Sequence, residues 1–245
     1  MLSDVTRKLK SLDVFNALSD RDLKEISPHF EIIHLRHREV LFVEDAPIQD
    51  LYLVLYGSFK IQKKVSNSTP VIFNFLGRGE FLGIAMADIA QPRYPATAIA
   101  NEDSAILRFS RDFFLSILVQ VHGVREVVKR QVSERFLELQ NDRCMEKGRM
   151  PQRIADLLLR LWERQGESSG SQIVIPITRK DIAQRLGTHT ETVIRVLSAW
   201  GKKGWIQTTD RRIDLLDIQK LQEIRHERSS EQSQRAAPED SDDVG

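Results

Sequence analysis

The segment that most constrains the fold lies near the carboxyl end and reads TRKDIAQRLGTHTETVIRVLSAWGKKGWI, residues 178–206. It contains two short amphipathic patterns, and a threonine, Thr178 or Thr188, stands where each predicted helix would be N-capped. Two helices that cross steeply over about three to four residues need a small side chain at the crossing and a glycine in the turn. Ala183 and Gly187 occupy those places. The spacing therefore predicts a helix-turn-helix.

The second of these helices carries side chains that are suited to reading base edges. Glu191 can accept a hydrogen bond from a cytosine amino group, and Arg195 can bond to guanine at two points. The two residues lie one helical turn apart, so they can also pair with each other. We therefore expect this helix to lie in a DNA major groove, with base contacts from Thr190, Glu191 and Arg195.

A basic hairpin follows the two helices. The run IQTTDRRIDLL, residues 206–216, predicts two strands with a pair of arginines near the tip, which is a wing beside the helices. The alternative is a structural three-helix module with a salt bridge on its surface. Residues expected to contact phosphates are Thr178, Arg179, Thr188, Lys202, Lys203, Arg211 and Arg212.

Charge is distributed unevenly along the 245 residues. The formal net charge is +1, but residues 1–144 are neutral, residues 145–228 carry +5 and residues 229–245 carry −4. The basic stretch coincides with the predicted helix-turn-helix, as expected for a module that contacts nucleic acid. The acidic end is polar with little to bury, so we expect residues 229–245 to be disordered.

Cysteine content and hydropathy exclude several classes of protein. The one cysteine, Cys144, allows neither a disulfide framework within the chain nor a cysteine-ligated iron–sulfur cluster. The amino terminus lacks the apolar core of a signal peptide, and no apolar run approaches the ~18–20 residues of a membrane span. We therefore expect a cytoplasmic protein without a membrane partner.

The front of the chain predicts a β-barrel. Between residues 30 and 109, short runs rich in Val, Ile, Leu, Phe and Tyr alternate with turn sequences such as EDAP, SNSTP and GRGE. Many short strands at this spacing are typical of a small antiparallel barrel of the double-stranded β-helix or jelly-roll type. The expected fold class is α+β: a barrel at residues 1–110, a helix and hinge at 111–146, and a winged helix-turn-helix at 147–228.

Apolar residues recur at helical spacing after the barrel and predict one long helix within residues 111–143. Such a helix is too long to pack wholly on a small barrel, and a symmetric dimer would cover its apolar stripe. The alternative is a helix folded back on its own barrel. The expected dimer residues are Val121, Val124, Val128, Val132 and Leu139.

This order of domains, together with ITRKDIAQRLGTHTETVIRVL and GRGEFLG, resembles the cAMP receptor protein/FNR superfamily of bacterial transcription regulators over about residues 10–225. The resemblance implies a homodimer, a palindromic operator with TGA/TCA-like half-sites, and contact with RNA polymerase. The family's Glu-x-x-x-Arg pair is matched by Glu191 and Arg195. Thr190 stands where the cAMP receptor protein has arginine, and Ile194 where FNR-type proteins have serine, so the outer bases of the half-site are open.

The sensor region departs from the family's cyclic-nucleotide cassette. A buried phosphodiester needs a cation and a hydrogen-bonding cradle, which the cassette supplies as Gly-Glu and, about ten residues on, Arg-Ser. Gly83-Ile84 and Tyr94-Pro95 stand at those places, and Arg93 lies one position early, on the opposite side of an extended strand. These residues argue against cyclic AMP in its usual mode. The expected sensor pocket consists of Gly83, Ile84, Met86, Tyr94, Pro95 and Ala96.

Several signals are compatible with this pocket. Residues 81–100 resemble the nitric-oxide-responsive regulators of denitrification, which implies haem, with His29, His34 or His37 as candidate axial ligands. The barrel can instead act without a ligand, its cavity filled by its own side chains, or bind a cyclic nucleotide in a non-standard way. No other metal site is assigned.

Two other functional classes make different predictions from a transcription regulator. In the first, a small-molecule-binding protein would use its helix-turn-helix for protein contacts, and its binding would lack the steep salt dependence of DNA binding. In the second, an enzyme would need a catalytic cluster, a metal-ligand spacing, a Walker loop or a nucleophile elbow, and the sequence shows none of them. We therefore expect a protein that is not an enzyme.

Overall fold

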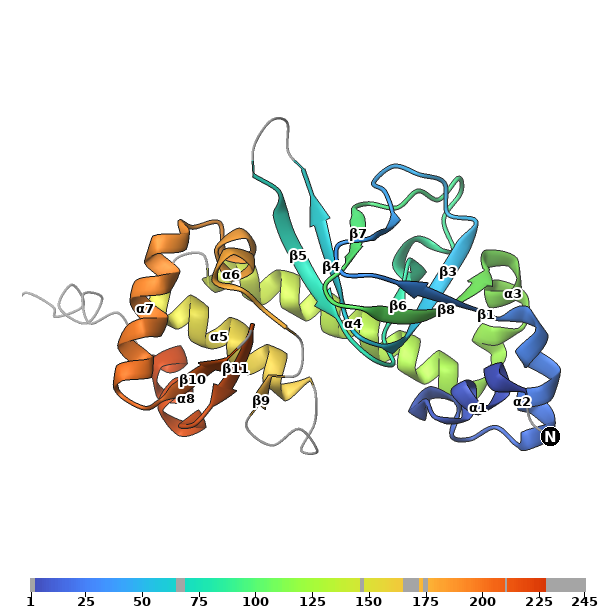
Figure 1. The fold of residues 1–245 in the computed structure, drawn as a ribbon. Helices are drawn as coiled ribbons and strands as arrows, with labels where there is room; N and C mark the ends of the chain where they lie inside the picture. The colour runs from blue at the N-terminus through green and yellow to red at the C-terminus, as the bar shows by residue number, and fades with distance from the viewer. Residues whose placement is uncertain are drawn as a thin grey trace, which may run out of the picture.

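The computed structural model describes residues 3–64, 69–145, 148–164, 172–173, 176–209 and 211–227. An antiparallel barrel lies against one end of a long helix, α4, and a smaller helical domain with its own sheet lies at the other end (Figure 1). The mixed helix-and-sheet architecture predicted from the sequence is confirmed. The predicted disordered segment at 229–245 lies outside the described residues.

The barrel consists of two four-stranded antiparallel sheets, in the orders β1-β8-β3-β6 and β2-β7-β4-β5. Their inner faces meet in one apolar core, to which the central strand β3 contributes the fully buried Leu51 and Leu53. The strands are β1 Glu31–Leu35, β2 Val40–Phe42, β3 Asp50–Tyr56, β4 Phe59–Lys63, β5 Val71–Leu76, β6 Phe81–Leu82, β7 Thr97–Ala100 and β8 Ser104–Ser110.

Short helices close the barrel at its amino-terminal end. Helix α1 (Asp4–Lys10) and helix α2 (Asp20–Ile26) begin at Ser3 and Ser19, whose hydroxyls accept backbone hydrogen bonds. Their apolar faces join the barrel core through Leu9 and Leu23. These amino-terminal helices lie beside the first turns of α4 (Figure 1).

The predicted single helix after the barrel is divided into three pieces. Helix α3 (Arg111–Ser116) is followed by a 3₁₀ turn (Leu118–Gln120), and α4 runs from His122 to Met145. Leu118 is fully buried in the barrel core, and the chain changes direction at the 3₁₀ turn that begins with this residue. Val121 therefore has extended backbone angles and precedes α4, so its assignment to the dimer helix is wrong.

The two halves of α4 face different surroundings. Val124 is fully buried and Val128 partly buried against the barrel core, so this half folds back on its own barrel. Val132, Phe136 and Leu139 are 43%, 59% and 59% exposed. The folded-back arrangement thus describes the first half of the helix, and the uncovered apolar stripe is confined to the second half.

The carboxyl-terminal domain packs four helices, α5 to α8, with a small antiparallel sheet of order β10-β11-β9. Helix α5 contributes more buried residues to the apolar core of this domain than any other element, and its Ile154, Leu158 and Leu159 are fully buried. No helix within the described ranges is both long and apolar enough to cross a membrane. The elements are α5 Met150–Glu163, β9 Gln172–Ile173, α6 Arg179–Leu186, α7 Thr190–Lys202, β10 Ile206–Thr209, β11 Arg212–Leu215 and α8 Ile218–His226.

Candidate DNA-reading helix and sensor cavity

Helix α6 begins and ends as the sequence predicts. The Thr178 hydroxyl accepts from the Asp181 amide at 3.0 Å, and the Asp181 carboxylate accepts from the Thr178 amide at 3.1 Å, which completes a capping box. Gly187 ends the helix with a left-handed backbone (φ 62°), and the next amide, of Thr188, donates to the Ala183 carbonyl at 3.0 Å. The turn is therefore encoded by these local residues.

The start of helix α7 differs from the prediction. Its N-cap is His189, which makes no side-chain capping bond, so the expected N-cap role of Thr188 is wrong. The Thr188 amide is already engaged in closing α6. The Thr188 amide thus closes the end of α6, and α7 begins at Thr190, one residue later than predicted.

Helix α7 buries one side and exposes the other. Val193, Leu197 and Trp200 pack into the domain core, whereas Glu191 and Arg195 are exposed. The side chains of Glu191 and Arg195 form no hydrogen bond or ion pair with a described residue, so they do not pair with each other in this structure. Both side chains are free to meet an external partner, which is the arrangement that base reading requires.

The other residues of the reading face have mixed surroundings. Thr190 is half-buried at the start of α7, and Ile194 is 43% exposed between the two charged positions. Lys202 and Lys203 are exposed at the end of the helix, and the Lys203 ammonium lies 4.4 Å from the centre of the Trp205 ring. This face therefore combines charged, hydroxyl and apolar groups.

The arginines expected to contact phosphates differ in whether they lie within the DNA-binding domain alone or also contact the barrel. Arg179 is exposed at the start of α6, and its guanidinium donates to the Thr208 hydroxyl of the wing at 3.4 Å. Arg212 lies in β11 and is half-buried. Arg211, at the wing tip, donates instead to the Asn101 carbonyl of the barrel at 2.8 Å. In this structure Arg211 is thus engaged by the sensor domain and is not presented to a phosphate.

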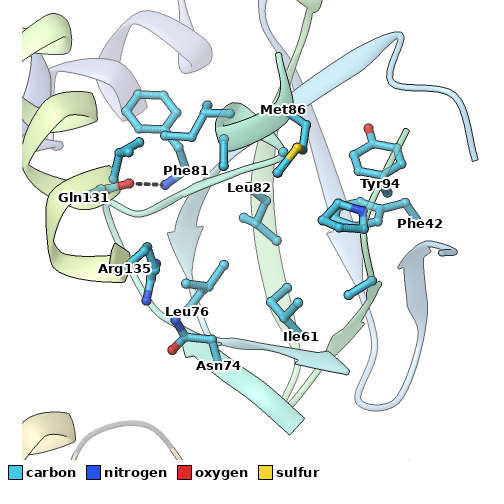
Figure 2. A pocket seen from close by; sticks show the side chains of 16 residues that line it. Phe42, Ile61, Asn74, Leu76, Phe81, Leu82, Met86, Tyr94, Gln131 and Arg135 are labelled. Carbon is cyan, nitrogen blue, oxygen red and sulfur yellow. Dashed lines mark hydrogen bonds between the residues drawn. The ribbon is translucent and has the colours of Figure 1, made fainter. Parts of the chain in front are cut away.

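A partly open cavity of about 240 Å³ lies between strands β4, β5 and β6, the segment 83–96 and helix α4. Figure 2 shows Tyr94 and Phe42 at one side of it and Asn74 and Arg135 at the other. The structure brings together all six predicted sensor residues: Gly83, Ile84, Met86, Tyr94, Pro95 and Ala96.

The Tyr94 end of the cavity is tightly built. The ring stacks on Phe42 with centroids 3.8 Å apart, and the hydroxyl donates to the Asp50 carbonyl at 2.6 Å. Burial raises the pKa of the Tyr94 hydroxyl far above its ordinary value, so this group is a neutral donor at any physiological pH. Gly83 has φ 86°, and a Cβ there would lie 2.9 Å from Leu51 and 3.2 Å from the Tyr94 ring. A side chain at this corner would need both a positive φ and a shift of the Leu51 side chain.

Charge in the cavity is already neutralised. Arg135, from α4, pairs with Glu80 at 2.6 Å and with Glu138 at 3.4 Å. Arg93 does not line the cavity; its side chain is more than half exposed and pairs with Asp45 at 3.8 Å. A phosphodiester entering the cavity would therefore meet no available cation among the described residues, and its desolvation would not be compensated.

The three candidate haem ligands lie outside the cavity. His29 stacks on Phe113 with centroids 4.3 Å apart, the His34 ring bonds to the Tyr56 hydroxyl at 3.1 Å, and the His37 ring bonds to the Asn101 carbonyl at 2.9 Å. None of the three histidines lines the sensor cavity, and their role as axial ligands stays a prediction.

The cavity itself does not fit haem. Of the described lining residues only Met86 offers a soft donor, and none is a histidine or cysteine. No cluster of three or more potential metal ligands occurs in the part of the chain that the structure describes. Cofactor and drug-sized ligands occupy pockets of about 300–1,000 Å³, so this space is also small for a haem macrocycle.

Sequence reasoning missed the polar side of the cavity. Gln131 and Arg135 come from α4, far in sequence from residues 83–96, and Asn74 comes from β5. Gln131 is 7% exposed, accepts from the Phe81 amide at 3.1 Å and donates to the Gly79 carbonyl at 3.1 Å. One signal was available, because Gln131 is a polar residue within an otherwise apolar helical stripe.

Comparison with known proteins supports both the barrel and the helix-turn-helix domain. Residues 32–120 match the family model described as a cyclic nucleotide-binding domain, and residues 152–224 match the one described as a Crp-like helix-turn-helix domain. These are the two domains of CRP/FNR-type regulators, in the same order. The chain therefore belongs to the CRP/FNR family of DNA-binding transcription regulators.

Individual relatives are distant. Transcriptional regulatory protein btr of Bordetella pertussis is 26% identical over 198 residues, which are 79% of this chain and 81% of the relative. The CRP-like cAMP-activated global transcriptional regulator of Mycobacterium tuberculosis is 21% identical over 211 residues, 85% of this chain and 94% of the relative. The structure of FixK2 from Bradyrhizobium japonicum has the same fold, with a TM-score of 0.70, 21% identity, and coverage of 82% and 99%.

Proposed function

We propose that this protein is a homodimeric transcription regulator that reads a palindromic operator and responds to a small, neutral, largely apolar molecule. The observation that carries the DNA-reading part is the outer face of α7, where Glu191 and Arg195 are exposed and unpaired with any described residue. Free charges held on a rigid helix are prepared for base edges, whereas charges paired within the protein are not. The proposal therefore assigns the bases of TGA/TCA-like half-sites to this pair.

The apolar stripe on the second half of α4 supports the dimer. Val132, Phe136 and Leu139 lie at three- to four-residue spacing and are all more than two-fifths exposed. An apolar stripe of this kind is covered most simply by the same stripe of a second copy. A two-fold dimer would present two α7 helices to successive major grooves, about 34–36 Å apart on the operator. RNA polymerase is the further partner expected for such a regulator.

Ile194 adds an apolar group to the reading face. It is 43% exposed on the same side of α7 as Glu191 and Arg195. Exposed aliphatic groups on a recognition helix match the C5-methyl of thymine, the one apolar feature of the major groove. We therefore assign a thymine to the half-site position beside the guanine that Arg195 reads.

The nature of the cavity supports the choice of signal. Its described lining is apolar except for Asn74, Gln131 and Arg135, and Arg135 is neutralised by two carboxylates. Such a site favours a neutral molecule with few hydrogen-bonding groups over an anion. Haem is not proposed, because the lining side chains do not fit it.

DNA reading is tested by fluorescence anisotropy on a TGA/TCA palindrome and on a scrambled duplex, with wild type and Glu191→Ala. Wild type is expected to prefer the palindrome, and Glu191→Ala is expected to lose much of that preference. Lys220→Ala, which also removes a charged side chain but lies on α8, is the control and should keep the preference. Equal binding of both duplexes by wild type would contradict the proposed function.

Signal recognition is tested by thermal unfolding with indole, a flat neutral probe with one N–H, and with cyclic AMP. Indole is expected to raise the unfolding temperature and cyclic AMP to leave it unchanged, because only indole avoids burying a phosphate. Stabilisation by cyclic AMP alone would favour a cyclic-nucleotide sensor with a non-standard pocket. No effect of either probe would favour a regulator that acts without a ligand.

A further inference from the structure

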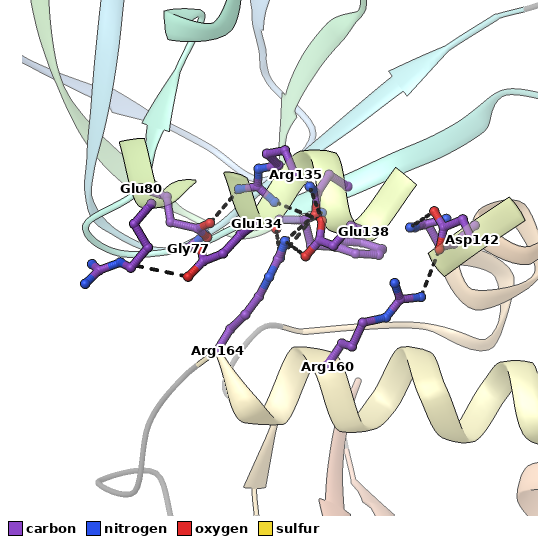
Figure 3. A network of polar contacts seen from close by, with 12 residues as sticks. Gly77, Glu80, Glu134, Arg135, Glu138, Asp142, Arg160 and Arg164 are labelled. Atoms are coloured by element: carbon purple, nitrogen blue, oxygen red, sulfur yellow. Dashed lines mark hydrogen bonds and ion pairs between the residues drawn. The ribbon is translucent and has the colours of Figure 1, made fainter. Parts of the chain in front are cut away.

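The cations of the DNA-binding domain that face the long helix are neutralised within the protein. The Arg164 guanidinium, at the end of α5, lies 2.6 Å from Glu138 of α4. Asp142 of α4 pairs with Arg160 of α5 at 2.9 Å and with Arg185 of α6 at 2.6 Å. Figure 3 shows Arg160 and Arg164 extending toward these carboxylates. These three arginines are therefore not available to an anion from outside.

A second set of cations, which we call the helix-turn-helix cations, forms no ion pair with any described residue. All of them are exposed: Arg179 and Lys180 at the start of α6, Arg195 within α7, and Lys202 and Lys203 at the end of α7. The one exposed carboxylate on these two helices is that of Glu191. The unpaired groups therefore carry a surplus of about four positive charges.

Two of the helix-turn-helix cations lie on one side of α7. Arg195 and Lys202 are seven residues apart, which is two helical turns, and the exposed Ser198 lies between them. Val193 and Leu197 form the buried side of the helix. Helix α7 thus presents an exposed stripe of positive charge, which attracts an anionic partner.

The chain itself contains an anionic segment of matching charge. Residues 229–245 carry a net charge of −4, and the run EDSDD at residues 239–243 holds four of the carboxylates. This segment lies outside the described residues. Its net charge is equal in size and opposite in sign to the surplus on α6 and α7, and its few apolar side chains leave little for another kind of contact.

The acidic segment follows a part of the chain that lies beside the turn between α6 and α7. The carbonyl of Glu227, just after α8, accepts a hydrogen bond from the Gln152 side chain at the start of α5. The next residue along α5, Arg153, donates to the Leu186 carbonyl at the end of α6 at 2.6 Å. The end of α8 and the helix-turn-helix are thus joined through two adjacent residues of α5.

The acidic run can reach every position on α7. Glu239 follows Glu227 by 12 residues, and a chain of that length spans at most about 40 Å. Helix α7 has 13 residues and is therefore about 20 Å long. Exposed ion pairs are individually weak, but tethering can hold the carboxylates at an effective concentration of about millimolar. Several weak pairs can therefore act together.

We propose that the acidic segment 229–245 of this chain docks on the helix-turn-helix cations and competes with DNA for them. The inference rests on the proposed DNA-reading function. Any duplex must displace the segment, so docking lowers the affinity for correct and incorrect sequences by the same factor. Because base preference comes from contacts to base edges, it stays unchanged. Salt screens exposed ion pairs, so the competition is strongest at low ionic strength.

Neutralising the acidic run tests the competition. The neutral-tail variant carries Glu239→Gln, Asp240→Asn, Asp242→Asn and Asp243→Asn. At about 50 mM salt its affinity for both the palindrome and the scrambled duplex is expected to rise about 5-fold, at the low end of the usual coupling between sites. At about 200 mM salt the rise should be smaller. Unchanged or lower affinity at low salt would overturn the proposal, and so would a gain confined to the palindrome.

A matched variant controls for substitution within the same segment. It carries four changes that leave the charge as it is: Ser229→Ala, Ser230→Ala, Gln232→Ala and Ser233→Ala. It should bind both duplexes as wild type does. A rise equal to that of the neutral-tail variant would show that charge is not the cause.

A second set of variants separates docking from a general gain in positive charge. Lys202→Gln with Lys203→Gln removes two of the helix-turn-helix cations, and neutralising the tail in that background should raise DNA affinity much less, because contacting groups couple and independent ones add. Lys220→Gln is the control, since Lys220 lies on α8 and pairs with Glu223 at 2.8 Å; it should keep the full rise. An equal rise in both backgrounds would overturn docking on these cations.

A DNA-free measurement separates docking from the proposed function. A nitroxide at Ser241→Cys, in isotope-labelled chains with Cys144→Ser, is diluted with unlabelled wild-type chains so that each label reports on its own chain. At low salt the nuclear magnetic resonance signals of the Arg195 and Lys202 amides should broaden, those of strand β1 should not, and added salt should reverse the effect. Absent or evenly spread broadening would show that docking is wrong even if DNA binding is as proposed. Selective broadening without palindrome preference would fault the proposed function alone.

Discussion

The two arginines Arg195 and Arg135 show how differently this molecule treats a positive charge. Arg195, on the outer face of α7, is exposed and unpaired with any described residue. Arg135, on the wall of the sensor cavity, is held by Glu80 and Glu138. An unpaired cation on a rigid surface is ready for an anionic partner, whereas a saturated cation leaves no charge for a ligand to neutralise. The contrast assigns DNA to α7 and a neutral molecule to the cavity.

The largest expected effect concerns the dimer, because operator reading needs two α7 helices at a fixed spacing. Phe136→Glu would bring two carboxylates together on the exposed half of α4, and we expect the dimer to dissociate. Palindrome affinity should then fall by a factor of about 100 or more, since the two half-sites would no longer be bound together. Sedimentation equilibrium and anisotropy measure the two effects.

Asn141→Glu is the matched control for that change, because it adds the same charge at an exposed position on another side of α4. It should leave a dimer with nearly wild-type affinity. A Phe136→Glu protein that remains dimeric would show that the apolar stripe is covered in some other way.

The next effect in size concerns Arg195 itself. Arg195→Ala should cost about 1–3 kcal/mol of discrimination between the guanine of the half-site and a substituted base. Competition binding with duplexes altered at that one base pair measures this. The comparison between the two arginines fails if Arg195→Ala weakens all duplexes equally, because the residue would then contact only phosphates.

The third prediction concerns Gly83 in the cavity wall, and it is measured as protein stability instead of DNA binding. Gly83→Ala should lower the free energy of unfolding by about 1–3 kcal/mol, because it adds a contact at 2.9 Å to a positive-φ backbone. Gly79→Ala has a similar φ of 78° and nothing within 4 Å of its Cβ, so it measures the backbone cost alone. Urea unfolding should show the larger loss for Gly83→Ala; equal losses would mean that the corner beside Tyr94 can relax.

The smallest expected effect concerns Ile194. Replacing the thymine beside the guanine with deoxyuridine removes one methyl group, which should cost wild type about 0.8 kcal/mol if that methyl is buried on Ile194. Ile194→Ala should bind both duplexes equally. A methyl effect that persists in Ile194→Ala would assign the contact to another side chain.

Local chemistry made the DNA-reading domain largely predictable. Thr178, Asp181 and Gly187 fix the start and end of α6 through bonds within a few residues, and the wing follows from alternation and turn residues. The one local error, at Thr188, arose because its amide serves the preceding helix. The six sensor residues could also be predicted, because all of them lie within the one segment 83–96 that matches the family's cassette in spacing.

Non-local packing explains what the sequence could not show. Val124 and Val128 have the same helical spacing as Val132, yet the barrel covers the first two and leaves the third exposed. Arg211 is a wing-tip arginine whose partner is a carbonyl 110 residues away. The pairing of Arg135 with Glu80 joins a helix to a barrel turn. Each of these contacts depends on how elements far apart in the sequence pack together, and the periodicity of one segment does not predict that packing.

The salt dependence of operator binding tests the central contrast most directly. Wild-type affinity for the TGA/TCA palindrome is measured by anisotropy between 50 and 200 mM salt, beside the scrambled duplex; because each neutralised phosphate releases counterions, affinity is expected to fall steeply, by orders of magnitude for about 6–10 contacts. At each salt concentration the palindrome should remain at least about 10³-fold preferred. A flat salt response with no preference would show that the free charges on α7 serve another partner, and would contradict the account.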